Sequence, residues 1–337
     1  GGDASYLVGG LPRWNPRGFR LGNGRWLVIE GDEYNTAFFD RGPKFLHYRP
    51  HLFILGPVEF DHADLYPDLN AVLTAFRAGA AQVPRDGAVV VTSWSEGSLA
   101  ACRDATAPVL TVGEAPGADL RLVSWEGGCE NRRALLCWRG CEIEMELPQS
   151  GLHNIQHAAV AVAAAAAAGV DPASGAGAMA TFPGVARRME IVGDAAGVVV
   201  VDDFAHHPTA LAATIQAARQ RWPERRLVVA FEPRSLTAAK RSFHEAYLAA
   251  LGAADLVLVA PPYHRGRFRE DEVLDRAALA EALAARGVRS VMPEPEDDPV
   301  AELLPIITRG DVVVDCSSGD FGGFPRRLAE ALLQKEG

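Results

Sequence analysis

Residues 198–231 decide the fold class of this chain, and they read VVVVDDFAHHPTALAATIQAARQRWPERRLVVAF. Two apolar runs typical of strands, Val198–Val201 and Leu227–Phe231, enclose a segment with the apolar spacing of a helix. Pro208 stands at the start of that segment, a position that proline favours in helices. The stretch therefore predicts a strand, a helix and a second strand, the repeating unit of an α/β fold.

The alternation of strands and helices continues to the end of the chain. Further apolar runs predict strands at Leu256–Val259, Ser290–Met292 and Val312–Asp315. This order is typical of a doubly wound, Rossmann-like sheet, and we assign residues 184–337 to a domain of that kind. The helices expected in this domain are Pro208–Arg221, Ala238–Leu251, Arg276–Arg286, Val300–Thr308 and Gly322–Leu333.

Residues 1–183 predict a separate α/β domain, with a parallel sheet covered by helices. The turns Gly127-Gly128 and Arg139-Gly140 predict antiparallel hairpins at the edge of that sheet. An alanine-rich helix ends at Gly169, and the Gly-, Ala- and Pro-rich stretch Asp171–Gly184 is the best candidate for a linker between the domains. The elements expected before the hairpins are strands at Trp26–Glu30, Leu52–Leu55, Ala88–Thr92 and Val109–Val112, and a helix at Pro67–Ala78.

Length, charge and cysteine content exclude several classes of function. The chain has 337 residues, which corresponds to two domains at roughly 150 residues each. Its 33 basic and 43 acidic side chains give a net charge of −10, so it lacks a positive field that would gather nucleic acid. Five cysteines, a sparse and odd set, indicate reduced thiols, and the alanine-rich run Ala158–Val170 is too weakly hydrophobic to span a bilayer. We expect a monomeric, cytoplasmic protein without membrane insertion.

Acidic residues follow two strands of the first domain. Glu30-Gly31-Asp32-Glu33 ends one strand, and Glu59-Phe60-Asp61-His62-Ala63-Asp64 follows the strand at Leu52–Leu55. Ligands of open α/β sheets bind at the carboxyl ends of strands, so we expect these acids and His62 at one edge of one sheet. Carboxylates there suit magnesium, which prefers oxygen ligands. The alternative is a solvated acidic turn.

Charged and small residues also follow the strands of the second domain. Asp203 ends its first strand, His206-His207 precedes a helix start with free N–H groups, and Arg187-Arg188 follows the linker. Arginines at such a place can bind phosphate or carboxylate. Glu232-Pro233-Arg234-Ser235 and the glycine-rich turn Ser317–Gly323 end two further strands. Each segment alone is also consistent with a structural turn or a surface charge pair.

Together these segments resemble the Mur ligase family over nearly the whole chain. The resemblance implies a central domain with an incomplete parallel sheet, a Rossmann-like C-terminal domain, and an ATP-dependent amide ligase. The residues that carry the resemblance are Glu30–Asp40, Lys44–Pro50, Glu59–Asp64, Gly151–Asn154, Arg187–Glu190, Asp202–Thr209, Phe231–Ser235 and Phe321–Gly323.

The resemblance implies a reaction between UDP-N-acetylmuramate and an acceptor amine, with ATP and Mg²⁺ as cofactors. The stretches Tyr34–Asp40 and Lys44–Pro50 favour the branch of peptidoglycan recycling whose acceptor is the murein tripeptide L-alanyl-γ-D-glutamyl-meso-diaminopimelate, over the branch that adds free L-alanine. Closure about the linker would assemble the site. The implied roles are magnesium binding for Glu30 and His62, catalysis for His62, His207 and Arg188, nucleotide binding for Asn154, His157, Arg188 and Asp203, and substrate binding for His206, His207, Arg234, Ser235, Ser317 and Gly319.

The sequence departs from the family at the phosphate-binding loop. The only lysines are Lys44, Lys240 and Lys335, and none follows a glycine-rich loop. The family carries that loop, with an N-terminal domain, upstream of the position where this sequence begins, so we expect a truncated chain whose ligase activity needs the missing part. Two alternatives remain: a silent relative that binds muropeptide or nucleotide without consuming it, and a metal-dependent hydrolase built on Asp61-His62-Ala63-Asp64 and Asp202-Asp203 with His206-His207.

Overall fold

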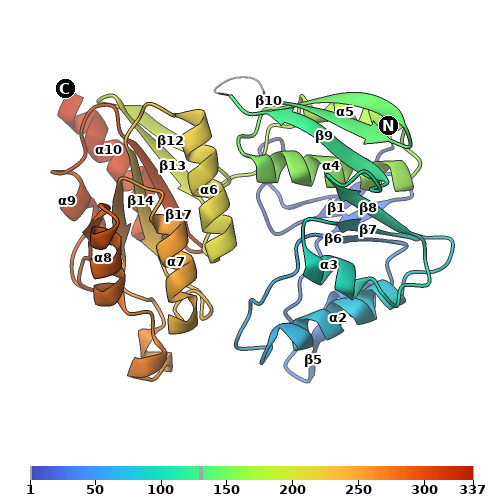
Figure 1. Ribbon diagram of the computed structural model, residues 1–337, viewed down its shortest axis with the longest axis horizontal. Coiled ribbons are helices and arrows are strands. Elements are labelled where there is room, and N and C mark those ends of the chain that lie inside the picture. Colours follow the sequence, from blue (N-terminus) through green and yellow to red (C-terminus); the bar gives the residue numbers. More distant parts are fainter. Residues whose placement is uncertain (1, 129–131, 337) are drawn as a thin grey trace. The chain divides into compact units, whose positions relative to one another are not determined.

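The computed structural model describes residues 2–128 and 132–336, and it divides into two compact units, Gly1–Ala186 and Arg187–Gly337 (Figure 1). Both units are α/β, with an edge of antiparallel strands in the first and a Rossmann-like sheet in the second. The fold class predicted from the sequence is therefore confirmed.

The main sheet of the first unit has the strand order β11-β10-β9-β8-β7-β6. From β6 to β9 neighbouring strands are parallel, whereas β9, β10 and β11 form antiparallel hairpins, as the turn residues predicted. The strands are β6 (Leu52–Leu55), β7 (Ala88–Thr92), β8 (Val109–Gly113), β9 (Leu120–Glu126), β10 (Arg132–Trp138) and β11 (Cys141–Leu147).

Helices cover both faces of this sheet. On one face lies α4 (Leu152–Ala167), whose alanines approach the strands closely, and Gly169 follows it with φ +91°, the left-handed conformation predicted for its end. On the other face α2 (Leu69–Ala81) begins at Asp68, whose side chain accepts a hydrogen bond from the Ala71 N–H at 2.8 Å. The shorter helices of this unit are α1 (Phe45–Tyr48), α3 (Glu96–Ala101) and α5 (Pro172–Met179).

The predicted linker was wrong over most of its length, because α5 occupies it. Asp171 caps this helix by accepting the Ser174 N–H at 2.9 Å, and Pro172 takes the first helical turn. Ala176 is fully buried in the core between α4 and the sheet. Small residues that read as a flexible segment therefore serve close packing.

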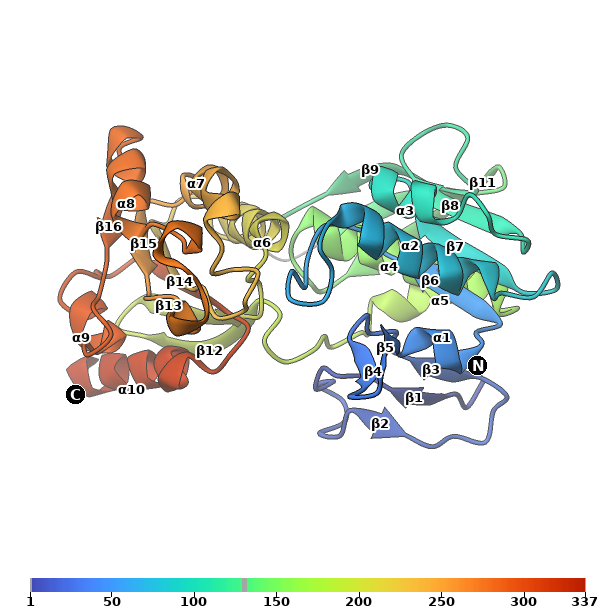
Figure 2. The ribbon, with the colours of Figure 1, turned by 90° about the horizontal axis from the view of Figure 1, so that it is seen from below.

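The predicted strand at Trp26–Glu30 exists but does not belong to the main sheet. It is β3 (Leu27–Ile29), which pairs in parallel with β1 (Ser5–Leu7) in a small sheet of order β2-β1-β3, seen in Figure 2. The expectation that it shares a sheet edge with β6 was therefore wrong. A hairpin of β4 (Asn35–Ala37) and β5 (Asp40–Pro43) follows β3, and β2 (Phe19–Arg20) completes the small sheet.

The sheet of the second unit has the order β12-β13-β17-β14-β15-β16, parallel except for β12. Helices α6, α7 and α8 pack on one face and α9 and α10 on the other, so the sheet is doubly wound. The strands are β12 (Glu190–Ala195), β13 (Val198–Asp203), β14 (Leu227–Glu232), β15 (Leu256–Val259), β16 (Arg289–Val291) and β17 (Val312–Ser317). The helices are α6 (Pro208–Arg221), α7 (His244–Leu251), α8 (Arg276–Ala285), α9 (Pro299–Leu303) and α10 (Phe324–Glu336), with single turns η1 (Arg241–Phe243), η2 (Arg265–Arg267), η3 (Glu270–Glu272) and η4 (Phe321–Gly323).

Among the residues that the structure describes, each unit holds one deeply buried thiol. Cys102 packs in the core under α2 and α3, and Cys316 lies on the central strand β17. These two, together with Cys137 and Cys141, are free thiols, and Cys129 lies outside the described residues. Among the helices of the described residues, none combines the length and the hydrophobicity that a bilayer crossing requires.

Candidate functional site

In the first unit, the loop after β3 meets the loop after β6 at His62. The imidazole Nε2 of His62 lies 2.8 Å from a carboxylate oxygen of Glu33, and the Tyr66 hydroxyl donates a hydrogen bond to the Glu33 carbonyl at 2.8 Å. The ring of Tyr34 packs edge-on against His62 at 4.3 Å. The two predicted acidic segments therefore do come together, although β3 and β6 belong to different sheets.

Several carboxylates set the electrostatics around His62. Burial lowers the pKa of His62, but the hydrogen bond with Glu33 and the charges of Asp61 and Asp64 outweigh it, so the net shift is upward. Burial and the neighbouring acids raise the pKa of Tyr34 to about 12. The surroundings of His62 thus favour positive charge.

The predicted magnesium pair, Glu30 and His62, has different side-chain partners in this structure. Glu30 accepts a hydrogen bond from the Gly9 N–H, so the acid that meets His62 is Glu33. Within residues 2–128 and 132–336, no group of three or more His, Cys, Asp or Glu side chains is arranged as a ready metal cage. A site for magnesium completed by phosphate and water needs only one or two carboxylates, and the acids at His62 fit that requirement.

The predicted nucleotide residues of the first unit lie at the start of α4. Asn154 donates from its side-chain amide to the Ser150 carbonyl at 2.7 Å, which fixes the side chain across the first turn. His157, one turn further, is exposed, and its ring contacts that of His153 with centroids 6.1 Å apart. Residues three apart share a helix face, so Asn154 and His157 can act together.

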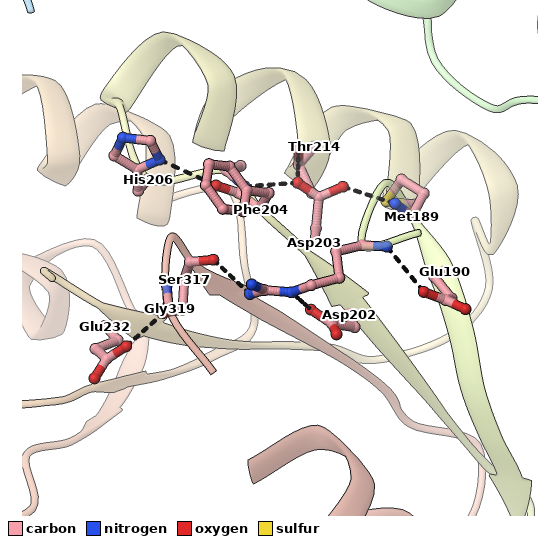
Figure 3. A network of polar contacts seen from close by, with 12 residues as sticks. Met189, Glu190, Asp202, Asp203, Phe204, His206, Thr214, Glu232, Ser317 and Gly319 are labelled. Atoms are coloured by element: carbon pink, nitrogen blue, oxygen red, sulfur yellow. Dashed lines mark hydrogen bonds and ion pairs between the residues drawn. The ribbon is translucent and has the colours of Figure 1, made fainter. Parts of the chain in front are cut away.

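In the second unit, Arg187 joins the ends of three strands through its partners Asp202, Ser317 and Glu190, which are labelled in Figure 3. Its Nε donates to Asp202 at 3.0 Å, its guanidinium donates to the Ser317 carbonyl at 2.7 Å, and its backbone N–H donates to Glu190 at 2.8 Å. Arg188 is exposed, and its guanidinium lies 5.2 Å from the centroid of the Phe204 ring. Arg187 therefore holds the loop, and Arg188 is the arginine that is open to a ligand.

Asp203 is buried, and its carboxylate is hydrogen-bonded to groups of the protein itself. Its carboxylate accepts the N–H groups of Met189 at 2.7 Å and Ala205 at 2.8 Å, and the Thr214 hydroxyl at 3.2 Å (Figure 3). Burial raises its pKa, which those backbone hydrogen bonds and the charge of Arg188 oppose. In this structure Asp203 fixes the segment that carries Arg188.

The two histidines stand where β13 runs into α6. The Nδ1 of His206 lies 3.0 Å from the Phe204 carbonyl, and its own carbonyl accepts the Tyr247 hydroxyl at 2.8 Å. His207 is the N-cap residue of α6, and its ring contacts Phe243 with centroids 5.4 Å apart. Both side chains are half-buried.

Arg234 is held at the ends of β14 and β17. Its guanidinium lies 4.2 Å from the centroid of the Tyr263 ring and 3.5 Å from Asp320. A Cβ added at Gly319 would overlap the Arg234 side chain. Ser317 donates its hydroxyl to Glu232, the strand neighbour that also lies 3.6 Å from Arg234. Ser235 accepts the Ala238 N–H at 2.9 Å, a turn-forming bond.

Sequence reasoning missed Glu33, Tyr263 and Asp315. Glu33 belongs to the quoted acidic motif, so its position could have suggested it, whereas nothing in the sequence around Tyr263 indicates a contact with Arg234. Asp315 was read as a strand end, but β17 continues to Ser317 and leaves Asp315 fully buried. Burial, and then the charge of Asp202, raise the pKa of Asp315 well above its usual range, against the effect of Arg187.

A mixed α/β unit followed by a Rossmann-like unit, each with charged side chains at the carboxyl ends of its parallel strands, is the architecture that the following comparisons identify as that of the ATP-dependent ligases that form amide bonds. The sequence profile described as "Mur ligase, glutamate ligase domain" matches residues 187–319. The UDP-N-acetylmuramate–L-alanyl-gamma-D-glutamyl-meso-2,6-diaminoheptandioate ligase of Escherichia coli (strain K12) is 32% identical over 343 residues, covering 98% of this chain and 70% of the relative. The chain belongs to the Mur ligase family.

Other relatives and solved structures agree with this assignment. A UDP-N-acetylmuramate–L-alanine ligase of Desulfosudis oleivorans is 32% identical over 322 residues, covering 95% of this chain and 68% of the relative. The crystal structure of a murein peptide ligase of Psychrobacter arcticus matches with a TM-score of 0.68 and 28% identity, covering 98% of this chain and 72% of that chain. The fold is also that of a UDP-N-acetylmuramate-alanine ligase of Thermotoga maritima, with a TM-score of 0.76 at 23% identity, covering 99% of this chain and 70% of that chain.

Proposed function

We propose that this protein is a cytoplasmic, ATP-dependent ligase that joins UDP-N-acetylmuramate to the amino group of L-alanyl-γ-D-glutamyl-meso-diaminopimelate. The observation that carries the ligase assignment is the His62–Glu33 pair, 2.8 Å apart among further carboxylates beyond β6, a setting suited to a magnesium-bound nucleotide. The peptide acceptor is supported by the Escherichia coli relative, which is named for that reaction and matches 98% of this chain.

The proposed chemistry has two steps. A carboxylate oxygen of the muramate attacks the terminal phosphorus of ATP and ADP leaves. The acceptor amine then attacks the acyl carbon, and phosphate leaves while the amine loses a proton. The protein has little covalent work in such a reaction, because positioning and charge stabilisation lower the barrier.

The residues of each unit take separate roles in this proposal. Glu30 and His62 are the proposed magnesium ligands, with His62 binding as the neutral imidazole beside Glu33, and a bound metal would supply charge that neutralises phosphate oxygens. Asn154 and His157 are assigned to the adenine. Arg188, exposed and placed by the Asp203 loop, is assigned to phosphate.

The second unit is assigned to the reacting, amino-terminal part of the acceptor peptide in this proposal. Arg234, held against Tyr263, can form a fork to a carboxylate, and Ser317 and Gly319 form the turn beside it. His206, His207 and Ser235 complete the proposed acceptor side, and His207 is proposed to act on the reacting groups.

The experiment is an amide-forming assay on the protein expressed from its complete coding sequence. UDP-N-acetylmuramate, ATP and Mg²⁺ are supplied with either the tripeptide or free L-alanine, and phosphate release and product mass are measured. We expect the tripeptide product, with kcat/KM for the tripeptide at least about a hundredfold above that for L-alanine. Absence of phosphate release with both acceptors would refute the ligase assignment.

The alternative acceptor is free L-alanine. The observation that favours it is the Desulfosudis oleivorans relative, an L-alanine ligase with the same 32% identity. Preferential formation of the L-alanine product in the same assay would establish this alternative. Tight binding of the tripeptide without consumption of ATP would instead indicate a silent relative.

A further inference from the structure

A cavity of about 350 Å³ lies between the β4–β5 hairpin and the turn after His62. Its size is near the lower limit of the range of about 300–1,000 Å³ for small-molecule pockets, which suits one or two amino-acid residues. The residues that line it are Asn35, Ala37, Phe38, Arg41, Asp64 and Leu65.

Hydrogen bonds hold the walls of this cavity in place. In the hairpin, the Thr36 hydroxyl donates to the Gly42 carbonyl at 2.8 Å, and His47 lies 2.8 Å from Asp40. The opposite wall is fixed by the Leu65 N–H, which donates to the His62 carbonyl at 2.8 Å. Glu33, which leads into β4, contacts both His62 and Tyr66, so it joins the two walls. The cavity is therefore preformed.

The charged groups of the cavity have opposite signs and stand on opposite walls. Arg41 comes from the hairpin and Asp64 from the turn, and both are exposed. Across the described ranges, neither side chain forms a hydrogen bond or a direct ion pair with another residue. Arg41 is a donor fork for a carboxylate, and Asp64 is an acceptor for an ammonium group.

This pair of charges excludes simpler ligands. Inside the cavity the Asp64 carboxylate repels a free phosphate, and the Arg41 guanidinium repels a free metal cation. Of the four remaining lining residues, Ala37, Phe38 and Leu65 are apolar and suit an aliphatic stem, and Asn35 is polar. The combination fits a ligand that carries a carboxylate and an ammonium group on one carbon at the end of an apolar chain.

We propose that this cavity binds the α-amino-acid end of the acceptor peptide, with the carboxylate on Arg41 and the ammonium group on Asp64. The inference rests on the proposed function and specifies its substrate. An amino group bound to Asp64 is protonated and has no lone pair, so it is not the amine that attacks the acyl carbon. The ligand therefore carries a second, non-reacting amino group, as a terminal diamino acid does and free L-alanine does not.

The test is calorimetric titration of the protein without ATP, using meso-diaminopimelate as the probe. Pimelate lacks its amino groups and cadaverine lacks its carboxylates, and both keep the aliphatic stem. We expect each to bind at least about tenfold more weakly than the probe, the effect of losing a hydrogen bond between charged groups. Arg41→Gln and Asp64→Asn should each weaken probe binding by a similar factor.

Two variants serve as matched controls. Arg85 and Asp86 are exposed neighbours on the turn before β7, at the amino ends of the strands, and Arg85→Gln and Asp86→Asn should leave binding unchanged. The pocket variants should also change selectivity: Arg41→Gln removes the preference over cadaverine, and Asp64→Asn removes the preference over pimelate. If these side chains had only a structural role, the two variants would not lose different selectivities.

Equal binding of the three probes, or equal losses in pocket and control variants, would overturn the cavity assignment. Amide formation separates this failure from that of the proposed function. If both pocket variants kept the wild-type KM for the tripeptide, the cavity assignment would be wrong, whereas the ligase assignment would still stand. Selective binding of meso-diaminopimelate with no amide formed would support the cavity and refute the ligase.

Discussion

Replacing Asp315 with valine is expected to stabilise the second unit. Asp315 is 0% exposed on the central strand β17, and neither carboxyl oxygen has a hydrogen-bond partner among the described residues. A buried polar group left in this state costs about 1–3 kcal/mol, and valine removes it while keeping a similar volume. We therefore expect Asp315→Val to raise the free energy of unfolding by about 1–3 kcal/mol.

The gain should depend on pH in a defined direction. Burial and the charge of Asp202 raise the pKa of Asp315 in the folded state well above the 3.8 of an ordinary aspartate. Between these two values the folded chain binds more protons than the unfolded chain, so wild-type stability falls as pH rises. The advantage of Asp315→Val should be smallest below about pH 4 and grow toward neutral pH. Asp315→Asn should remove the pH dependence with less gain, because it keeps the unpartnered polar atoms.

A second buried aspartate provides the opposite control. Asp311 is 1% exposed, but its carboxylate accepts hydrogen bonds from Arg226 at 2.6 and 2.9 Å and from the Thr308 N–H at 2.8 Å. Removing one partner of a buried ion pair costs about 3–5 kcal/mol, and the partial exposure of Arg226 places Asp311→Val near the lower value. Both substitutions replace a buried aspartate with valine, but Asp315→Val should raise the free energy of unfolding and Asp311→Val should lower it.

Urea titration with hydrogen exchange of residues 312–317 measures the stability of this unit. Thermal unfolding gives a second readout, at about 2–4 °C per kcal/mol for a domain of this size. A lower stability of Asp315→Val at neutral pH, or a gain that is the same at every pH, would show that the burial argument is wrong.

Substitutions at three other positions test the second unit. Gly319→Ala should displace Arg234 and raise KM for the acceptor peptide while the melting temperature stays near that of the wild type; an unchanged KM would contradict the contact. Tyr263→Leu should weaken peptide binding about two- to fivefold, and Tyr263→Phe should not, because the ring and not the hydroxyl contacts the guanidinium. Asp203→Asn should cost about 1–3 kcal/mol of stability, because an amide cannot accept all three hydrogen bonds; equal denaturation midpoints would argue against this.

The second unit was predictable because its signals are local. The helix Pro208–Arg221 has its predicted bounds, since proline at the first turn and continuous apolar spacing fix both ends. β12 was missed because Gly193 and a bulge interrupt its pattern, and its pairing with β13 depends on tertiary context. The predicted helix Ala238–Leu251 begins only at His244, because Ser235 and η1 form turns in its first part.

The first unit depends more on contacts between distant segments. The apolar pattern of β3 is the same whether it pairs with β6 or with β1, so sequence alone could not choose its sheet. For the candidate site, the sequence predicted that acids lie beside His62, but it did not show which acid contacts the imidazole. Glu30 and Glu33 belong to the same short motif, and only the path of the loop decides that Glu33 meets His62 while Glu30 binds the Gly9 N–H. The nucleotide and peptide roles of the predicted residues stay predictions.

The buried thiols of the two units have a practical consequence. Burial raises the pKa of Cys102 to about 11 and raises that of Cys316 well above its usual range, so neither is a ready thiolate in the folded protein. Cys141, which is exposed, should react with an alkylating reagent at once. Pulsed alkylation followed by mass spectrometry of the individual peptides would thus time the opening of each unit separately, with no label added to the protein beforehand.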